Sequence, residues 1–101
     1  MKDGKKPTAR RQAGKERNMK RIKEFETAWV RISLLTEPKL YQEGSFYYVR
    51  EIGLTAANEH DTLQTFHIKQ EAEKEYQRLQ ELLRDNGDAI METIYKEPIN
   101  A

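Results

Sequence analysis

The spacing of the apolar side chains changes once along this chain, and that change sets the fold class. Three stretches before residue 70 alternate apolar and polar residues with a period of two, which is typical of strands with one buried face. Residues 70–85 repeat apolar side chains at spacings of three and four, which predicts a helix with one apolar stripe. Strands followed by one such helix indicate an α+β domain.

The three alternating stretches predict an antiparallel meander. They cover residues 25–34, 45–53 and 62–69, and the segments between them, 36–44 and 53–61, contain the proline, glycine and polar residues of turns. In the first stretch, alternation places one set of side chains on the buried face: Ala28, Val30, Ile32 and Leu34. The chain therefore carries at least three consecutive strands.

The helix and the segment after it complete the predicted domain. Acidic residues fall in the first turns of the helix, where the helix dipole favours them, and Gly87 provides a left-handed stop. Residues 88–97 fit either a strand or a short helix, and we predict a strand. The expected fold is α+β, with a three- to four-stranded antiparallel sheet covered on one face by one amphipathic helix.

Positive charge is concentrated at the start of the chain. Residues 1–23 hold ten basic and two acidic side chains, a net of +8, whereas the whole chain has a net charge of only +1. We expect a basic arm over residues 1–23, a domain over residues 24–97 and a tail over residues 98–101. The arm contains helix-forming residues but few apolar ones, so it is expected to be flexible or to become helical only when its charges are neutralised.

The basic arm indicates a polyanionic partner. Lysine and arginine bind phosphate backbones with release of counterions, which gives an affinity that falls steeply with salt. The expected nucleic-acid contacts are Arg10, Arg11, Lys15, Arg17, Lys20 and Arg21. Three other interpretations stay open: a solubilising tail, a membrane-surface patch, and an arm that folds back on the acidic domain. Attraction between exposed charges is screened beyond about 8 Å at physiological salt, so a polyanion is expected to displace a folded-back arm.

Aromatic residues form the second signal. Alternation places Trp29, Tyr47 and Tyr41 on or near the sheet face opposite Val30, beside two arginines. Such a face can stack bases or anchor a partner protein, and the alternative is that these rings pack within the domain. The expected partner-binding residues are Trp29, Arg31, Tyr41, Tyr47 and Arg50.

No residue pattern indicates catalysis, a metal or a cofactor. The chain has no cysteine, and its two histidines, His60 and His67, match no metal-ligand spacing. Glu51 is the best candidate for a general acid, but it is more simply a side chain that faces solvent or pairs with a cross-strand base such as Arg31. No phosphate-binding glycine loop or nucleophile motif is present. We therefore expect a protein that is not an enzyme.

The sequence contains no long apolar stretch and no signal peptide, so we expect a cytoplasmic protein without a membrane partner. The expected function is a non-enzymatic binding module whose basic arm engages nucleic acid or a nucleoprotein and whose aromatic sheet face docks a partner. The alternative is a protein-binding accessory or inhibitor protein, in which the acidic domain contacts a basic target surface and the arm is incidental.

Overall fold

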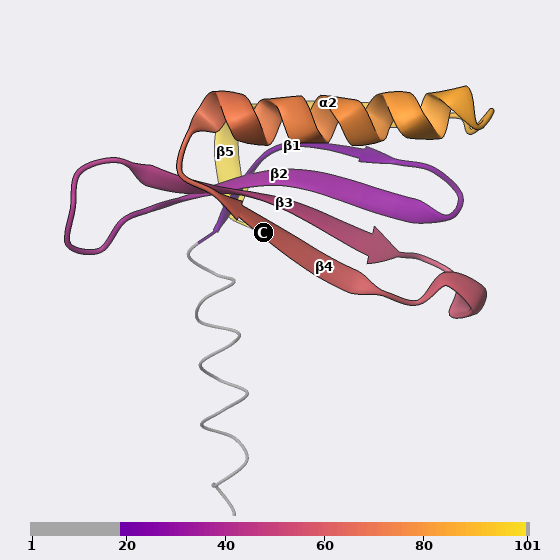
Figure 1. Ribbon diagram of the computed structural model, residues 1–101, viewed down its shortest axis with the longest axis horizontal. Coiled ribbons are helices and arrows are strands. Elements are labelled where there is room, and N and C mark those ends of the chain that lie inside the picture. The colour runs from indigo at the N-terminus through magenta and orange to yellow at the C-terminus, as the bar shows by residue number, and fades with distance from the viewer. Residues whose placement is uncertain (1–18, 101) are drawn as a thin grey trace, which may run out of the picture.

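The computed structural model describes residues 19–100 of the chain and shows an α+β domain. One helix packs on one face of a five-stranded antiparallel sheet, in which the strand order is β4-β3-β2-β1-β5 (Figure 1). The expected fold class is confirmed, but the strand count of three to four was too low. The elements are β1 Lys20–Glu26, β2 Val30–Pro38, β3 Ser45–Gly53, the 3₁₀ turn η2 Ala56–Asn58, β4 Asp61–Phe66, α2 Lys69–Asp85 and β5 Met91–Asn100.

The additional strand arises where we expected one strand to begin at Phe25. The chain instead turns at residues 27–29, and β1 and β2 pair as a hairpin. The Thr27 hydroxyl oxygen accepts hydrogen bonds from the backbone N–H groups of Trp29 and Val30, each at 3.1 Å. This side-chain turn contains no glycine, proline or asparagine, so the usual turn signals are missing from the sequence.

The sheet extends beyond the expected domain limits at both ends. Strand β1 begins at Lys20, so Lys20, Arg21 and Lys23 lie in the sheet rather than in a basic arm. Strand β5 confirms the strand expected in residues 88–97, but it continues to Asn100 and pairs with β1, so residues 98–100 are not a tail. Residues 1–18, which hold the rest of the expected arm, and Ala101 lie outside the described residues.

Helix α2 begins one residue before the predicted start and ends at the predicted residue, Asp85. Two backbone hydrogen bonds cap its C-terminus. The N–H of Gly87 donates to the carbonyl of Arg84 at 3.0 Å, and the N–H of Asp88 donates to the carbonyl of Leu83 at 3.1 Å. Gly87 has φ +85°, a conformation that glycine adopts without strain. Among the described residues, no helix is both long and apolar enough to cross a membrane.

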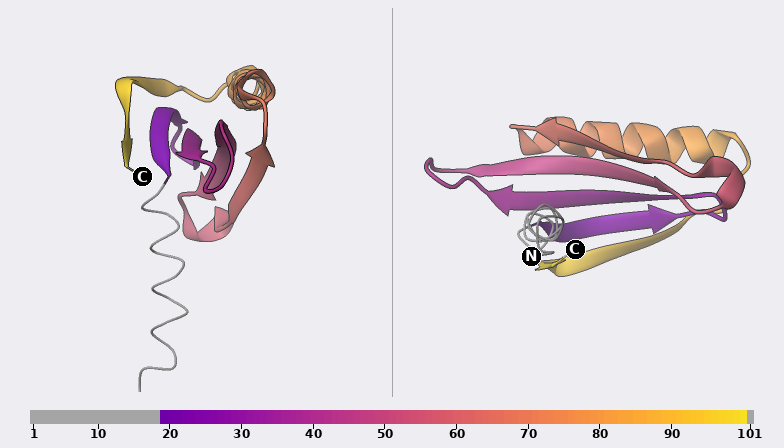
Figure 2. Two further views of the ribbon diagram at one scale, coloured as in Figure 1. Left: turned by 90° about the vertical axis from the view of Figure 1, so that its left-hand side faces the viewer. Right: turned by 90° about the horizontal axis from the view of Figure 1, so that it is seen from below.

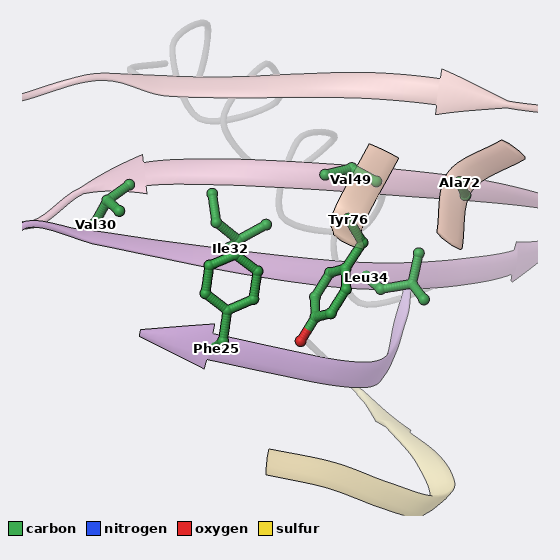
Figure 3. Packing of buried hydrophobic residues seen from close by; sticks show 7 residues of the cluster. All are labelled: Phe25, Val30, Ile32, Leu34, Val49, Ala72 and Tyr76. Atoms are coloured by element: carbon green, nitrogen blue, oxygen red, sulfur yellow. The ribbon is translucent and has the colours of Figure 1, made fainter. Parts of the chain in front are cut away.

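The core lies between α2 and the sheet face that it covers. Figure 3 shows its side chains converging from β1, β2, β3 and α2. The buried cluster consists of Phe25, Val30, Ile32, Leu34, Val49, Ala72 and Tyr76. At its centre the rings of Phe25 and Tyr76 meet edge to face, with centroids 4.9 Å apart and an interplanar angle of 75°. This contact joins helix α2 to strand β1 of the sheet.

Candidate nucleic-acid interface

No helix among the described residues covers the sheet face opposite α2, which we call the open face (Figure 2), although Ser33, Leu35 and Tyr48 on it are buried. Carboxylates and arginines alternate across it. Glu26 accepts a hydrogen bond from Nε of Arg31 at 2.8 Å, and Asp61 accepts two from the guanidinium of Arg50 at 3.0 and 2.7 Å. Most of the charge on this face is therefore already balanced within the domain.

Glu24 links two strands of the same face. It accepts a hydrogen bond at 2.9 Å from the hydroxyl of the buried Ser33 and lies 3.6 Å from the guanidinium of Arg21. The Arg21 guanidinium also lies over the ring of Tyr95, 5.2 Å from its centroid. A second apolar cluster of Met19, Leu35 and Tyr48 is buried on this face.

The five expected partner-binding residues do not form one surface. Tyr47 was expected on the face opposite Val30, but it packs against the core cluster beneath α2. The reason is the register of β3, which pairs Tyr47 with Thr36 and thereby places it on the same face as Leu34. Only Arg31 and Arg50 of the five lie on the open face.

The other two expected partner-binding residues lie at opposite ends of the sheet. Trp29 is in the β1–β2 turn, half exposed, and its carbonyl accepts hydrogen bonds from the N–H of Leu54 at 2.8 Å and the side-chain amide of Asn58 at 3.1 Å. Tyr41 is in the β2–β3 loop and is 95% exposed. The nine residues of β2, about 30 Å of strand, separate these two ends.

Two of the six expected nucleic-acid contacts fall within the described residues. Lys20 is exposed at the start of β1, where its backbone pairs with Thr36 of β2 and Asn100 of β5. Arg21, by contrast, is held by Glu24 and Tyr95. The remaining four, Arg10, Arg11, Lys15 and Arg17, lie outside the described residues.

The loop between β2 and β3 holds two exposed apolar side chains, Leu40 and Tyr41, of which only Tyr41 was an expected partner-binding residue. Leu40, beside Tyr41, is 83% exposed, so two large side chains stand next to each other at the end of the hairpin. Pro38 ends β2, and the N–H of Lys39 donates to the carbonyl of Gly44 at 3.2 Å, closing the loop behind them. In the sequence, Pro38 and Gly44 mark the two ends of the loop. Leu40 and Tyr41 lie between them, outside the alternating stretches on either side.

The histidines are far from forming a metal site. His60 follows η2, and its ring nitrogens lie 3.0 Å from the Asn58 carbonyl and 2.8 Å from the Glu51 carboxylate. His67 follows β4 and packs against the ring of Phe46, with centroids 5.3 Å apart. Within residues 19–100, no group of three or more potential ligands could hold a metal ion. The cross-strand partner suggested for Glu51 was Arg31, but Glu51 contacts His60, and Arg31 pairs with Glu26.

Ion pairing lowers the pKa of two carboxylates. Hydrogen bonds from Arg50 hold the pKa of Asp61 below its ordinary value, and hydrogen bonds from Arg78 do the same for the pKa of Glu75. The Glu75 side chain is mostly buried and also accepts a hydrogen bond at 2.9 Å from the Gln64 amide of β4. It therefore ties α2 to the edge of the sheet.

The lowered pKa of Glu75 predicts a specific acid sensitivity. Because the folded-state pKa is below the unfolded value of about 4.3, ionised Glu75 adds stability above that pH, and this contribution is lost as pH falls through the folded pKa. We expect Glu75→Gln to be less stable than the unmodified protein at pH 7 and to show a shallower loss of stability between about pH 5 and 3. Urea unfolding across this pH range measures it. The matched change Glu73→Gln should leave the acid limb unchanged, and equal acid limbs for both variants would contradict the prediction.

Comparison of the chain with protein-family models, curated proteins and solved structures gives no significant match.

Proposed function

We propose that this protein is a non-enzymatic binding module whose basic N-terminal segment, residues 1–18, engages the phosphates of nucleic acid. The observation that carries the proposal is the distribution of charge. This segment holds seven basic and two acidic side chains, a net of +5, whereas residues 19–101 hold eleven basic and fifteen acidic side chains, a net of −4. Such a concentration of cations matches a polyanion, which releases its counterions on binding.

The pairing within the domain supports an intermolecular partner over an intramolecular one. On the open sheet face, Glu24, Glu26 and Asp61 each contact an arginine of the domain itself. A basic segment bound to these carboxylates would compete with pairs that are already made. Exposed charges that are not in contact attract one another only weakly at physiological salt. A nucleic acid therefore has the advantage over the domain as the partner of residues 1–18.

The contacts proposed are Arg10, Arg11, Lys15, Arg17 and the exposed Lys20. Arg21 is left out because Glu24 and Tyr95 already hold its guanidinium. Docking of a partner protein on an aromatic sheet face is also left out, because Trp29, Tyr41 and Tyr47 do not share a face.

The test is binding of the full chain to labelled single- and double-stranded oligonucleotides over a salt series from 50 to 200 mM. Neutralising Arg10, Arg11, Lys15 and Arg17 to glutamine is expected to weaken binding to both probes. It should also reduce the slope of log K against log salt by about 0.9 for each duplex phosphate that the variant no longer neutralises, and by about 0.7 for each phosphate of a single strand.

A matched control removes the same amount of charge from the domain surface. Lys69, Lys74, Arg84 and Lys96 are all exposed, and changing them to glutamine is expected to leave most of the affinity and the salt slope in place. Failure of the unmodified chain to bind either probe at 50 mM salt would overturn the proposal. Equal losses of affinity for the two quadruple variants would show that net charge, rather than the N-terminal segment, is responsible, and would overturn it as well.

A further inference from the structure

We infer that the tip of the β2–β3 hairpin, Leu40 and Tyr41, is a base-stacking site for single-stranded nucleic acid. The inference rests on the proposed function and adds to it the strand type and the residues that recognise it. Figure 1 shows this loop extending beyond the rest of the sheet, at the opposite end from the β1–β2 turn. The tip is therefore accessible from several directions.

Strand β1 begins at the same end of the sheet as the tip. Lys20 is the first residue of β1, and its backbone pairs with Thr36 of β2. From Thr36, five residues of chain lead to Tyr41, a span of at most about 17 Å when fully extended. The exposed Lys20 and the Tyr41 ring are therefore close enough for a strand of a few nucleotides to reach both.

The two side chains of the tip, Leu40 and Tyr41, are largely exposed and do not belong to either apolar cluster of the domain. Tyr41 is 95% exposed and Leu40 is 83% exposed, whereas Phe46 and Tyr48 of the adjoining strand pack into the second apolar cluster. A single exposed apolar side chain is ordinary on a protein surface, but two large neighbours at the end of a projecting hairpin are characteristic of a contact surface.

The charge of the chain that leads into β1 favours a nucleic-acid strand as the occupant of the tip. Lys20 is exposed at the start of β1, and Lys39 adjoins the tip, with its ammonium group 5.4 Å from the centre of the Phe46 ring. Two glutamates oppose these lysines: Glu37, which accepts a hydrogen bond from the Tyr48 hydroxyl, and the exposed Glu43. Residues 1–18, whose sequence carries a net charge of +5, join the domain at Met19, next to Lys20, whereas residues 19–101 carry a net charge of −4.

The ring selects single strands because only they offer the face of a base. In a duplex, both faces of each base are covered by its neighbours, so an exposed tyrosine at a loop tip has nothing to stack on. Stacking of an aromatic side chain on a base tolerates any sequence, because every base has a π face. The site is therefore expected to discriminate by strand type and not by sequence.

The experiment measures binding of the full chain to a labelled 15-nucleotide oligo-dT and to a duplex of the same length. Tyr41→Ala is expected to weaken binding to the single strand at least about fivefold at every salt concentration, without changing the salt slope, because stacking releases no counterions. Its affinity for the duplex should stay within about twofold of the unmodified protein. Tyr41→Phe keeps the ring and should restore single-strand affinity.

Trp29→Ala is the matched control, because it removes an exposed aromatic side chain from the opposite end of the sheet. Its affinity for both probes should be unchanged. If the unmodified chain binds but Tyr41→Ala binds the single strand equally well, the tip inference is overturned while the proposed function stands. Equal losses of affinity for single strand and duplex would also overturn the inference, as would an equal effect of Trp29→Ala. Absence of any binding by the unmodified chain overturns both.

Discussion

Replacing Phe25 with alanine is expected to lower the free energy of unfolding by about 3–5 kcal/mol, the range for removing a large aromatic side chain from a core. Phe25 has no exposed surface, and its ring contacts Tyr76 of α2 edge to face. The loss is severe for this protein, because a domain of this size is stabilised by only about 4–12 kcal/mol in total. Urea unfolding followed by circular dichroism measures the change.

A smaller variant keeps this prediction testable if the alanine variant does not fold. Phe25→Leu retains most of the apolar volume and is expected to cost about 1–2 kcal/mol. Leu40→Ala is the control, because its side chain is 83% exposed and the change should lie within about 0.5 kcal/mol of zero. If Phe25→Ala were no more destabilising than Leu40→Ala, the packing of β1 beneath the helix would be wrong.

Replacing Gly53 with alanine is expected to lower the free energy of unfolding by about 2 kcal/mol or more, because the added methyl group has no room. A Cβ atom at this position would lie 1.5 Å from the carbonyl oxygen of Asn58 and 2.8 Å from Nδ1 of His60. The obstacle is backbone, so residues 54–60 have to move as a unit. The N–H of Gly53 also donates to the carbonyl of His60 at 2.8 Å, a bond that this movement strains or breaks.

The same substitution has an optical readout. Trp29 is the sole tryptophan of the chain, and Leu54 and Asn58 both donate hydrogen bonds to its carbonyl. Displacement of the 54–60 segment is therefore expected to shift the tryptophan emission of Gly53→Ala. Ala57→Ser, an exposed change in η2, should alter neither stability nor emission. A Gly53→Ala protein with unmodified stability and emission would show that the close approach of Asn58 to Gly53 is incorrect.

Local patterns predicted helix α2 well, because its signals are contained within the helix and the residues next to it. The apolar stripe that includes Ala72 and Tyr76 marks its buried face, and Gly87 marks its end. The third alternating stretch was also recognised, although β4 ends at Phe66 and Ile68 is instead the N-cap residue of α2. These features depend on residues at most a few positions apart.

The β1–β2 hairpin was missed because its turn carries no local signal. Apolar residues continue from β1 into β2 on both sides of Thr27, whose hydroxyl closes the turn, so the sequence does not mark where one strand ends and the next begins. Residues 20–23, which were expected in the arm, instead belong to β1. Lys20 and Arg21 are therefore parts of the sheet, and Arg21 contacts Glu24 and Tyr95. The candidate site changed for the same reason.

Amino-acid order by itself determined the fold class, the helix, and the gathering of cations at the start of the chain. Each of these depends on the periodicity or composition of a single segment. Tertiary structure alone decided which face each strand turns towards α2, since a shift of one residue in register exchanges the two faces. That choice packed the partly buried Tyr47 against the core beneath the helix, and the length of β2 placed Trp29 and Tyr41 at opposite ends of the sheet. Pairing between distant segments sets such positions, and no single segment contains that information.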